Sequence, residues 1–205
     1  MTFKDYYKPS FLEVICGCMK SGKSETLMHR IRMLNYVADL DYKLFKPKID
    51  DRFSSTDVCS RNGMKHNAFV IDENNPEELI KYLEDSTKVV AIDEAQFFSF
   101  ELVDVVHFLR RKNLNVIVSG LDTDFRGKPF CVMSYLCSVA DYVEKLHAIC
   151  EYKDEHGNKC NNLANRSQRL INGKPAPYDS PIIMLGDEEY YEARCIHHHI
   201  VPGKD

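Results

Sequence analysis

The chain has 205 residues, 44% of them apolar, and a formal net charge of −4 at pH 7. This length suits one sizeable core with a small appended lobe, but not two large domains. The acidic balance disfavours a general nucleic-acid or membrane-surface binder, because such proteins need a positive surface field. No stretch approaches the roughly 18 consecutive apolar residues of a membrane span, and the first residues lack a signal-peptide core, so we expect a cytoplasmic protein.

The first predicted unit is a strand, a loop and a helix in that order. Residues 11–16 are typical of a buried strand, and residues 24–37 carry apolar side chains at helical spacing. The loop between them spells G-x-x-x-x-G-K-[ST] in full, from Gly17 to Ser24. In such loops the backbone N–H groups surround phosphates, the lysine reaches the β- and γ-phosphates, and the hydroxyl binds Mg²⁺. The pattern therefore predicts that Lys23 and Ser24 hold a nucleotide with its magnesium ion.

Strands and helices alternate along the following hundred residues. We expect strands at 42–46, 68–71, 88–93, 114–120 and 142–149, helices at 75–85, 99–113 and 129–141, and a long polar loop at 47–66. Such alternation implies a parallel sheet with helices on both faces. The predicted fold is therefore α/β of the phosphate-loop NTPase type, with an ATP-binding domain at residues 1–149.

Two carboxylates, Asp93 and Glu94, end the predicted strand at 88–93, at the sheet edge where α/β proteins bind ligands. Asp93 would hold Mg²⁺ together with Ser24. Glu94 could orient an attacking water, as in an ATPase, or accept the proton of a substrate hydroxyl, as in a kinase. The string "DEAQ" also resembles the box of certain helicases, but those need two nucleotide-binding lobes. We therefore favour a kinase for a small hydroxyl substrate over a single-lobe ATPase.

Residues 150–205, named the C-terminal lobe from here on, are polar and rich in turn residues. A segment of this kind cannot build a core of its own and usually requires a staple such as a metal ion. Cys195 and His198 have the two-residue gap of a zinc knuckle. Cys150 and Cys160 would complete a Cys₃His tetrahedron around a structural zinc ion.

The spacing of the first cysteine pair leaves alternatives open. Nine residues separate Cys150 from Cys160, whereas about two to four is usual in zinc sites, so the intervening residues must loop outward. His197 or His156 could replace one ligand. Without a metal, the cysteines would be buried free thiols beside an exposed histidine run. The lobe has seven basic and nine acidic residues, a balance that disfavours a zinc knuckle for nucleic acid.

A series of motifs resembles the type II thymidine kinases, the zinc-containing cytosolic family. The resemblance runs from about residue 11 to residue 200, through "GCMKSGKSE", "KPKIDDR", "VVAIDEAQFF", "SGLDTDFRGKPF", "ADYVEKLHAIC" and "YYEARCIHHH". It implies ATP-dependent phosphorylation of thymidine at the 5′-hydroxyl, giving thymidine monophosphate. It also implies a homotetramer that is inhibited by thymidine triphosphate. A kinase for another pyrimidine nucleoside is the alternative within the same reaction class.

The resemblance further implies roles at the phosphate end of the site. Ser24 and Asp93 would hold Mg²⁺, and Glu94 would be the general base that faces the nucleoside hydroxyl. Asp50 and Arg52 match a D-x-R element that steadies the hydroxyl, the base and the phosphates. The residues implied to bind ATP and its phosphates are Gly17, Met19, Lys20, Ser21, Gly22, Lys23, Ser24, Asp50 and Arg52.

The implied nucleoside site has apolar walls and a closing loop. A lasso-like loop at about 170–190, supported by the metal, would cover the base and read its edge mostly through backbone groups. The residues implied to contact the nucleoside are Met19, Phe97, Leu121, Phe125, Ser167, Met184, Leu185, Gly186 and Tyr191. Without the resemblance, the phenylalanines and Leu121 would be interpreted as ordinary core residues.

Two positions depart from the family's pattern. Cys18 stands where the family usually has a proline, a change that would soften the phosphate loop without removing a donor to phosphate. The first cysteine pair is spaced C-x₉-C instead of C-x-x-C. Zinc therefore follows from the resemblance less directly than catalysis does.

Overall fold

The computed structural model describes residues 9–37, 40–49, 57–59, 65–183 and 191–203. Its main feature is a six-stranded sheet in the order β5-β2-β6-β7-β1-β8, in which every neighbouring pair is parallel. Its strands are β1 Leu12–Gly17, β2 Asp41–Pro47, β5 Phe69–Ile71, β6 Thr87–Ile92, β7 Asn115–Gly120 and β8 Tyr142–Leu146. The structure confirms the predicted α/β fold class.

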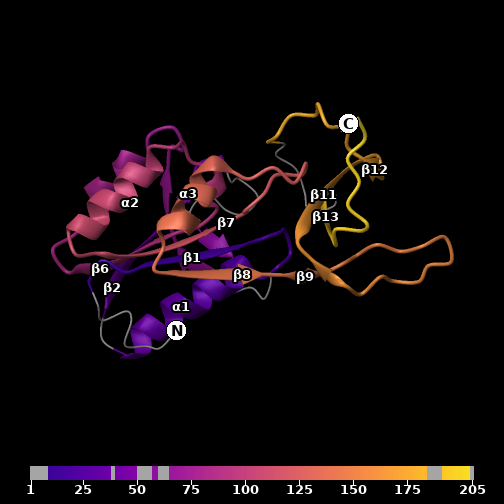
Figure 1. The fold of residues 1–205 in the computed structure, drawn as a ribbon. Coiled ribbons are helices and arrows are strands. Elements are labelled where there is room, and N and C mark those ends of the chain that lie inside the picture. The colour runs from indigo at the N-terminus through magenta and orange to yellow at the C-terminus, as the bar shows by residue number, and fades with distance from the viewer. Residues whose placement is uncertain (1–8, 38–39, 50–56, 60–64, 184–190, 204–205) are drawn as a thin grey trace.

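Helices cover both faces of the sheet, as Figure 1 shows. Successive side chains of a strand point to opposite faces. On one face Val14 packs in a cluster with α2 (Leu102–Arg111) and α3 (Cys131–Val139). On the other face Ile15 packs with α1 (Lys23–Val37). Because both faces are covered, β1 and β7 are buried at every position, which explains the apolar runs at residues 14–16 and 116–118.

The prediction of an α-helix at residues 75–85 is wrong in the type of helix. The structure has a 3₁₀ helix, η2 (Pro76–Tyr82), in which only Pro76 and Leu79 are buried. Buried positions three residues apart line up on a 3₁₀ helix, whereas an α-helix needs a broader apolar stripe to be held against a core. A second 3₁₀ helix, η3 (Ala95–Phe97), follows directly after the two carboxylates that end β6.

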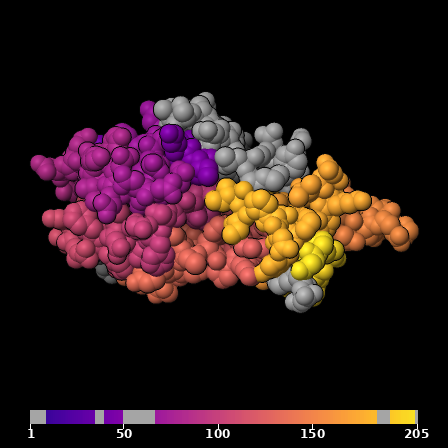
Figure 2. Space-filling view, turned by 90° about the horizontal axis from the view of Figure 1, so that it is seen from above, coloured from indigo at the N-terminus to yellow at the C-terminus, as the bar shows by residue number. Residues whose placement is uncertain are grey.

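The strand predicted at 142–149 is two strands. β8 ends at Leu146, and β9 (Ala148–Ile149) leaves the large sheet to pair with β10 (Leu163–Ala164). Beyond it, β12 (Lys174–Pro175), β11 (Arg166–Ile171) and β13 (Tyr191–Arg194) form a three-stranded antiparallel sheet. Figure 2 shows the C-terminal lobe against one end of the rest of the molecule, with the hairpin between β9 and β10 (residues 150–162) projecting farthest. The division at residues 149 and 150 stays a prediction.

Two smaller points complete the fold. Part of the polar loop expected at 47–66 is a short antiparallel pair, β3 (Asp57–Cys59) with β4 (Lys65–Asn67). In the part of the chain that the structure describes, no helix combines the length and the apolar character that crossing a membrane requires.

The carboxyl ends of β1, β6 and β7 lie side by side at one edge of the sheet. The register places Cys16 beside Gly120 and Ile92 beside Val118. The loops that follow these three strands therefore meet at this edge, which is where parallel sheets bind ligands.

Candidate functional site

The loop after β1 has the conformation that its glycines permit. Gly17 has φ of 148°, Gly22 of 85° and Lys20 of 64°. A Cβ atom at Gly17 would lie 2.4 Å from the carbonyl oxygen of Leu146, so only glycine fits where β1 approaches β8. The helix α1 begins at Lys23, and the first N–H groups of a helix have no partner within it. The predicted strand, loop and helix are thus present, with a helix N-terminus suited to phosphate.

Two side chains of this loop converge on one carbonyl group. The Lys23 ammonium and the Ser21 hydroxyl both donate to the carbonyl oxygen of Cys18, each at 2.8 Å. A phosphate would offer Lys23 a charged acceptor, and charge-assisted hydrogen bonds are stronger than bonds to a neutral carbonyl. The Lys23 ammonium therefore lies at the loop, and we expect it to exchange the carbonyl group for a phosphate when a nucleotide binds.

Asp93 is buried at the end of β6 and contacts the start of α1. Its N–H donates to the carbonyl oxygen of Phe45 at 2.9 Å. Burial and the neighbouring Glu94 raise the pKa of Asp93 to about 6, while hydrogen bonds from groups that include the Ser24 hydroxyl act against this rise. The structure thus brings Ser24 and Asp93 together. Hydroxyl and carboxylate oxygens are ligands that Mg²⁺ prefers, and a bound cation would offset the unfavourable charge of the buried carboxylate.

Glu94 occupies the strained position between β6 and η3. Its φ of 50° and ψ of 40° are left-handed values, which non-glycine residues adopt at some energetic cost and often at functional sites. Its carboxylate accepts a hydrogen bond from the side chain of Gln96, a residue that the sequence did not single out. Phe97 lies in η3 and Leu121 directly after β7, so both predicted nucleoside residues are at the same sheet edge.

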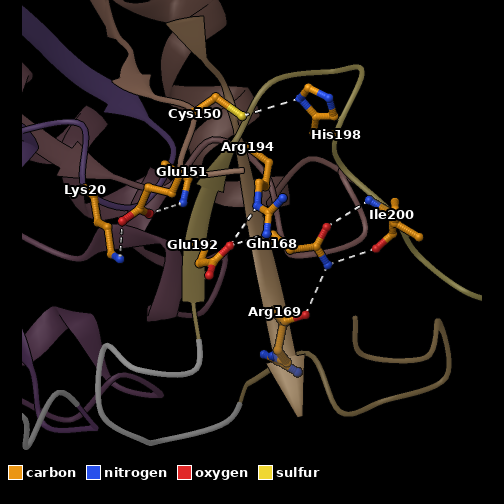
Figure 3. Close-up of polar contacts among 10 residues, drawn as sticks. Lys20, Cys150, Glu151, Gln168, Arg169, Glu192, Arg194, His198 and Ile200 are labelled. Atoms are coloured by element: carbon orange, nitrogen blue, oxygen red, sulfur yellow. Dashed lines mark hydrogen bonds and ion pairs between the residues drawn. The ribbon is translucent and has the colours of Figure 1, made fainter. Parts of the chain in front are cut away.

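The phosphate loop contacts the C-terminal lobe at three places. The N–H of Met19 donates to the Ser167 hydroxyl at 3.0 Å, and the Cys18 thiol lies 3.4 Å from the carbonyl oxygen of Ala164. Lys20 forms an ion pair with Glu151 at 2.9 Å, as Figure 3 shows. Met19 and Ser167, predicted at the nucleoside, are therefore brought together. Lys20, predicted at the phosphates, is bound instead to an acidic residue of the lobe.

Arg169 contacts two further predicted nucleoside residues, Phe125 and Tyr191, although nothing in its sequence context indicated this. It is 1% exposed, and its guanidinium lies 4.3 Å from the ring centre of Phe125 and 5.2 Å from that of Tyr191. It donates from Nε to the Tyr191 hydroxyl at 2.8 Å, and also to the carbonyl oxygens of Pro181 and Ile182. One buried cation thus joins Phe125 and Tyr191, both predicted at the nucleoside, to the segment predicted as a lasso.

The four predicted metal ligands lie in one cluster. Their ligand atoms, from Cys150, Cys160, Cys195 and His198, all lie within 4.8 Å of one another. The Sγ atoms of Cys160 and Cys195 are 3.9 Å apart, and Nδ1 of His198 is 3.8 Å and 3.4 Å from Sγ of Cys150 and Cys195. Thiolates about 2.3 Å from a tetrahedral zinc ion would lie about 3.8 Å from each other, so the donor set and its size fit zinc.

The surroundings act in opposite directions on two thiols of the cluster, because burial raises the pKa of Cys150 whereas the pKa of Cys195 is lowered. Burial acts to raise the pKa of Cys195, but the N–H groups of His197 and His198 lower it. The Tyr152 ring stacks on the His198 ring with the centroids 4.0 Å apart. The alternative ligands are not in this cluster, since His197 is exposed and His156 pairs with Glu155 at the hairpin tip.

Five of the predicted site residues lie outside the described part of the chain. They are Asp50, Arg52, Met184, Leu185 and Gly186. Their assigned roles therefore stay predictions.

Comparison with known proteins found a matching family model, a similar curated protein and a distantly similar solved structure. The family model described as thymidine kinase matches residues 10–199. A thymidine kinase from Coprothermobacter proteolyticus is 47% identical over 194 residues, which cover 95% of this chain and 92% of the relative. The solved structure of the genome packaging NTPase B204 from Sulfolobus turreted icosahedral virus 2, in complex with ATP-gammaS, covers 73% of this chain and 79% of that chain. Its identity of 17% and TM-score of 0.42 are too low to carry an argument.

Proposed function

Because this chain belongs to the thymidine kinase family, we propose that Glu94 is the base that accepts the 5′-hydroxyl proton of thymidine during transfer of the γ-phosphoryl group from ATP. One observation supports this assignment above the others. The phosphate loop after β1 and the carboxylates Asp93 and Glu94 after β6 meet at one sheet edge. A phosphate held in the loop is therefore next to a carboxylate that could receive a proton.

The loop residues have separate tasks in this proposal. The N–H groups of the loop and the Lys23 ammonium bind the β- and γ-phosphates. Ser24 and Asp93 hold the magnesium ion, which neutralises phosphate charge when bound. Glu94 takes the proton as the nucleoside oxygen forms its bond to the γ-phosphorus, and ADP leaves with the electrons of the broken P–O bond. Most of the rate would come from positioning and charge neutralisation.

The C-terminal lobe would complete the nucleoside side of the site. Ser167 and Met19 lie at the contact between the lobe and the phosphate loop, and Phe125 and Tyr191 lie around Arg169. Residues 170–190 would close over the base. A structural zinc ion held by the Cys₃His cluster would stabilise the lobe that carries this loop.

Family membership also supports three finer proposals, a cytoplasmic location, a homotetramer and inhibition by thymidine triphosphate. Sedimentation that gives a monomer at working concentration would contradict the tetramer. Unaltered activity in excess triphosphate would contradict the inhibition.

The reaction is tested by incubating the protein with Mg-ATP, with and without thymidine, and measuring both ADP and thymidine monophosphate. We expect ADP only with thymidine and in equal amount to the monophosphate. Equal ADP without nucleoside would make water the acceptor and the protein an ATPase. The Glu94→Gln variant should lower kcat by ~10²–10⁴ with ATP binding kept, and full turnover in this variant would refute the assigned base.

A further inference from the structure

The side chain of Gln96 connects Glu94 to the end of β7. Its Nε2 donates to Oε2 of Glu94 at 2.6 Å, and its Oε1 accepts the N–H of Leu121 at 2.9 Å. The residue is 5% exposed, and its partners Glu94 and Leu121 are half-buried. We infer that Gln96 is a positioning residue, which holds the Glu94 carboxylate in the orientation for accepting the substrate proton. This inference rests on the proposed role of Glu94 as the base.

The chemistry of the two partners fixes the direction of both bonds. A backbone N–H can only donate, so the amide oxygen of Gln96 must be the atom that faces Leu121. The amide nitrogen then faces Glu94 and donates to it. The carboxylate oxygen Oε2 is therefore held as an acceptor by a group that is itself anchored to the sheet.

The surrounding residues hold the amide in place. A Cβ atom at Gly120 would lie 2.8 Å from Oε1 of Gln96 and 2.8 Å from the sulfur of Met133. A side chain at position 120 would therefore displace the amide or Met133. Met133 is fully buried in α3, so the space on that side is filled. Glu94 itself stands on a strained turn, and the bond from Gln96 restricts the rotamers of its carboxylate.

A role in packing alone does not explain a glutamine at this position. Burying an amide is unfavourable unless its polar atoms are bonded, and methionine has nearly the same shape without any such requirement. The amide is useful here because it transfers the rigidity of the sheet to the carboxylate. Misplacement of a reacting group by about 1 Å can lower a rate by about 10²-fold, which gives the size of effect to expect.

The test is a double-mutant cycle with Gln96→Met and Glu94→Gln. We expect Gln96→Met to lower kcat by ~10–100-fold while the KM values for Mg-ATP and thymidine change less than about threefold. In the Glu94→Gln background the same replacement should change kcat less than about twofold, because no carboxylate is left to position. Equal losses in both backgrounds would overturn the inference. Full turnover of Glu94→Gln alone would instead refute the proposed base.

The chain offers a matched control and a milder variant. Gln168 is also a buried glutamine bonded on both sides, to the N–H and the carbonyl oxygen of Ile200, but it lies in the C-terminal lobe. Gln168→Met should therefore show equal effects with and without Glu94→Gln. Gln96→Asn keeps the amide but is one methylene shorter, so it cannot reach both partners. If Gln96→Met fails to fold, as judged by cooperative melting, the cycle with Gln96→Asn decides the question.

Discussion

The parallel sheet and the C-terminal lobe are held together by different forces. The sheet lies between two clusters of buried aliphatic side chains, one on each face. Among the described residues of the lobe, the buried apolar side chains are alanines and cysteines, and Ser167, Gln168 and Arg169 are buried beside them. Apolar burial is non-directional and tolerates small changes, whereas hydrogen bonds and metal ligands require particular atoms. A single substitution should therefore disrupt the lobe more easily than the sheet.

The strongest test of this difference is the loss of one metal ligand. Cys195→Ser should prevent binding of the proposed zinc ion and loosen the lobe, because structural zinc contributes about 10–16 kcal/mol to the folding of small zinc domains. We expect about one zinc per chain in the parent protein, none in the variant, and loss of thymidine binding with retained binding of a Mg-ATP analogue. Limited proteolysis should cut residues 150–203 and leave the sheet intact. An unchanged cleavage pattern would contradict the prediction, and Cys131→Ser, an exposed cysteine of α3, is the control.

The next test concerns Asp93, a buried carboxylate at the end of the sheet whose charged form should destabilise the folded state. Burial and Glu94 raise the pKa of Asp93 from 3.8 to about 6 in the folded protein. The folded state therefore binds more protons between these values, and the free energy of unfolding should fall as the pH rises from about 4 through 6, by about 3 kcal/mol at most. Asp93→Asn should remove this pH dependence and make the magnesium-free protein more stable at pH 8, but not at pH 4.

Denaturant unfolding at several pH values measures this effect. Equal stabilities of the parent and Asp93→Asn at pH 8 would show that the carboxylate is not destabilising in the folded state. The same variant should lose Mg-ATP-dependent activity at every pH, since Asp93 is proposed to hold the metal.

The buried cation of the lobe should matter for thymidine but not for ATP. Arg169→Met leaves the Tyr191 hydroxyl and the Pro181 carbonyl without their charged partner, and a hydrogen bond to a charged group is worth about 1.5–3 kcal/mol. We expect the KM for thymidine to rise by ~10–100-fold, with the KM for Mg-ATP almost unchanged. Arg166→Met, on the same strand, is the control. A similar rise in both KM values would show that Arg169 stabilises the whole molecule and has no specific effect on thymidine binding.

The smallest effect is expected at the ion pair between the two regions. Lys20 and Glu151 are partly exposed, and exposed pairs typically contribute about 0–1 kcal/mol. Glu151→Gln should therefore lower the melting temperature only slightly, and less at high salt than at low salt. Glu151 also accepts the N–H of Ala193 at 2.7 Å, a bond that glutamine can keep. A large and salt-independent loss would show that this contact holds the lobe on the phosphate loop.

The features that sequence predicted well are local in the chain. The phosphate loop, the strands that flank it and the pair Asp93 and Glu94 each follow from residues within one short stretch. Gln96 and Arg169 were missed because their partners, Leu121 and Tyr191, lie 25 and 22 positions away. The helix at 75–85 was predicted from Asn75 and Pro76 as its opening residues, which do not distinguish an α-helix from a 3₁₀ helix. Only Pro76 and Leu79 of η2 are buried, at a three-residue spacing that suits a 3₁₀ helix.

Because of the projecting hairpin, the number of residues between Cys150 and Cys160 does not determine how far apart the two thiols lie in space. The N–H of Cys160 donates to the carbonyl oxygen of Tyr152 at 3.0 Å, Lys153 is bridged to Lys159, and Asp154 accepts the N–H groups that close the turn. The hairpin therefore closes on itself, and its two ends are neighbours whatever its length. For the cluster, a C-x₉-C pair with such a hairpin is equivalent to a C-x-x-C pair. The tip is consequently free to lengthen, shorten or carry an inserted peptide without moving a single ligand.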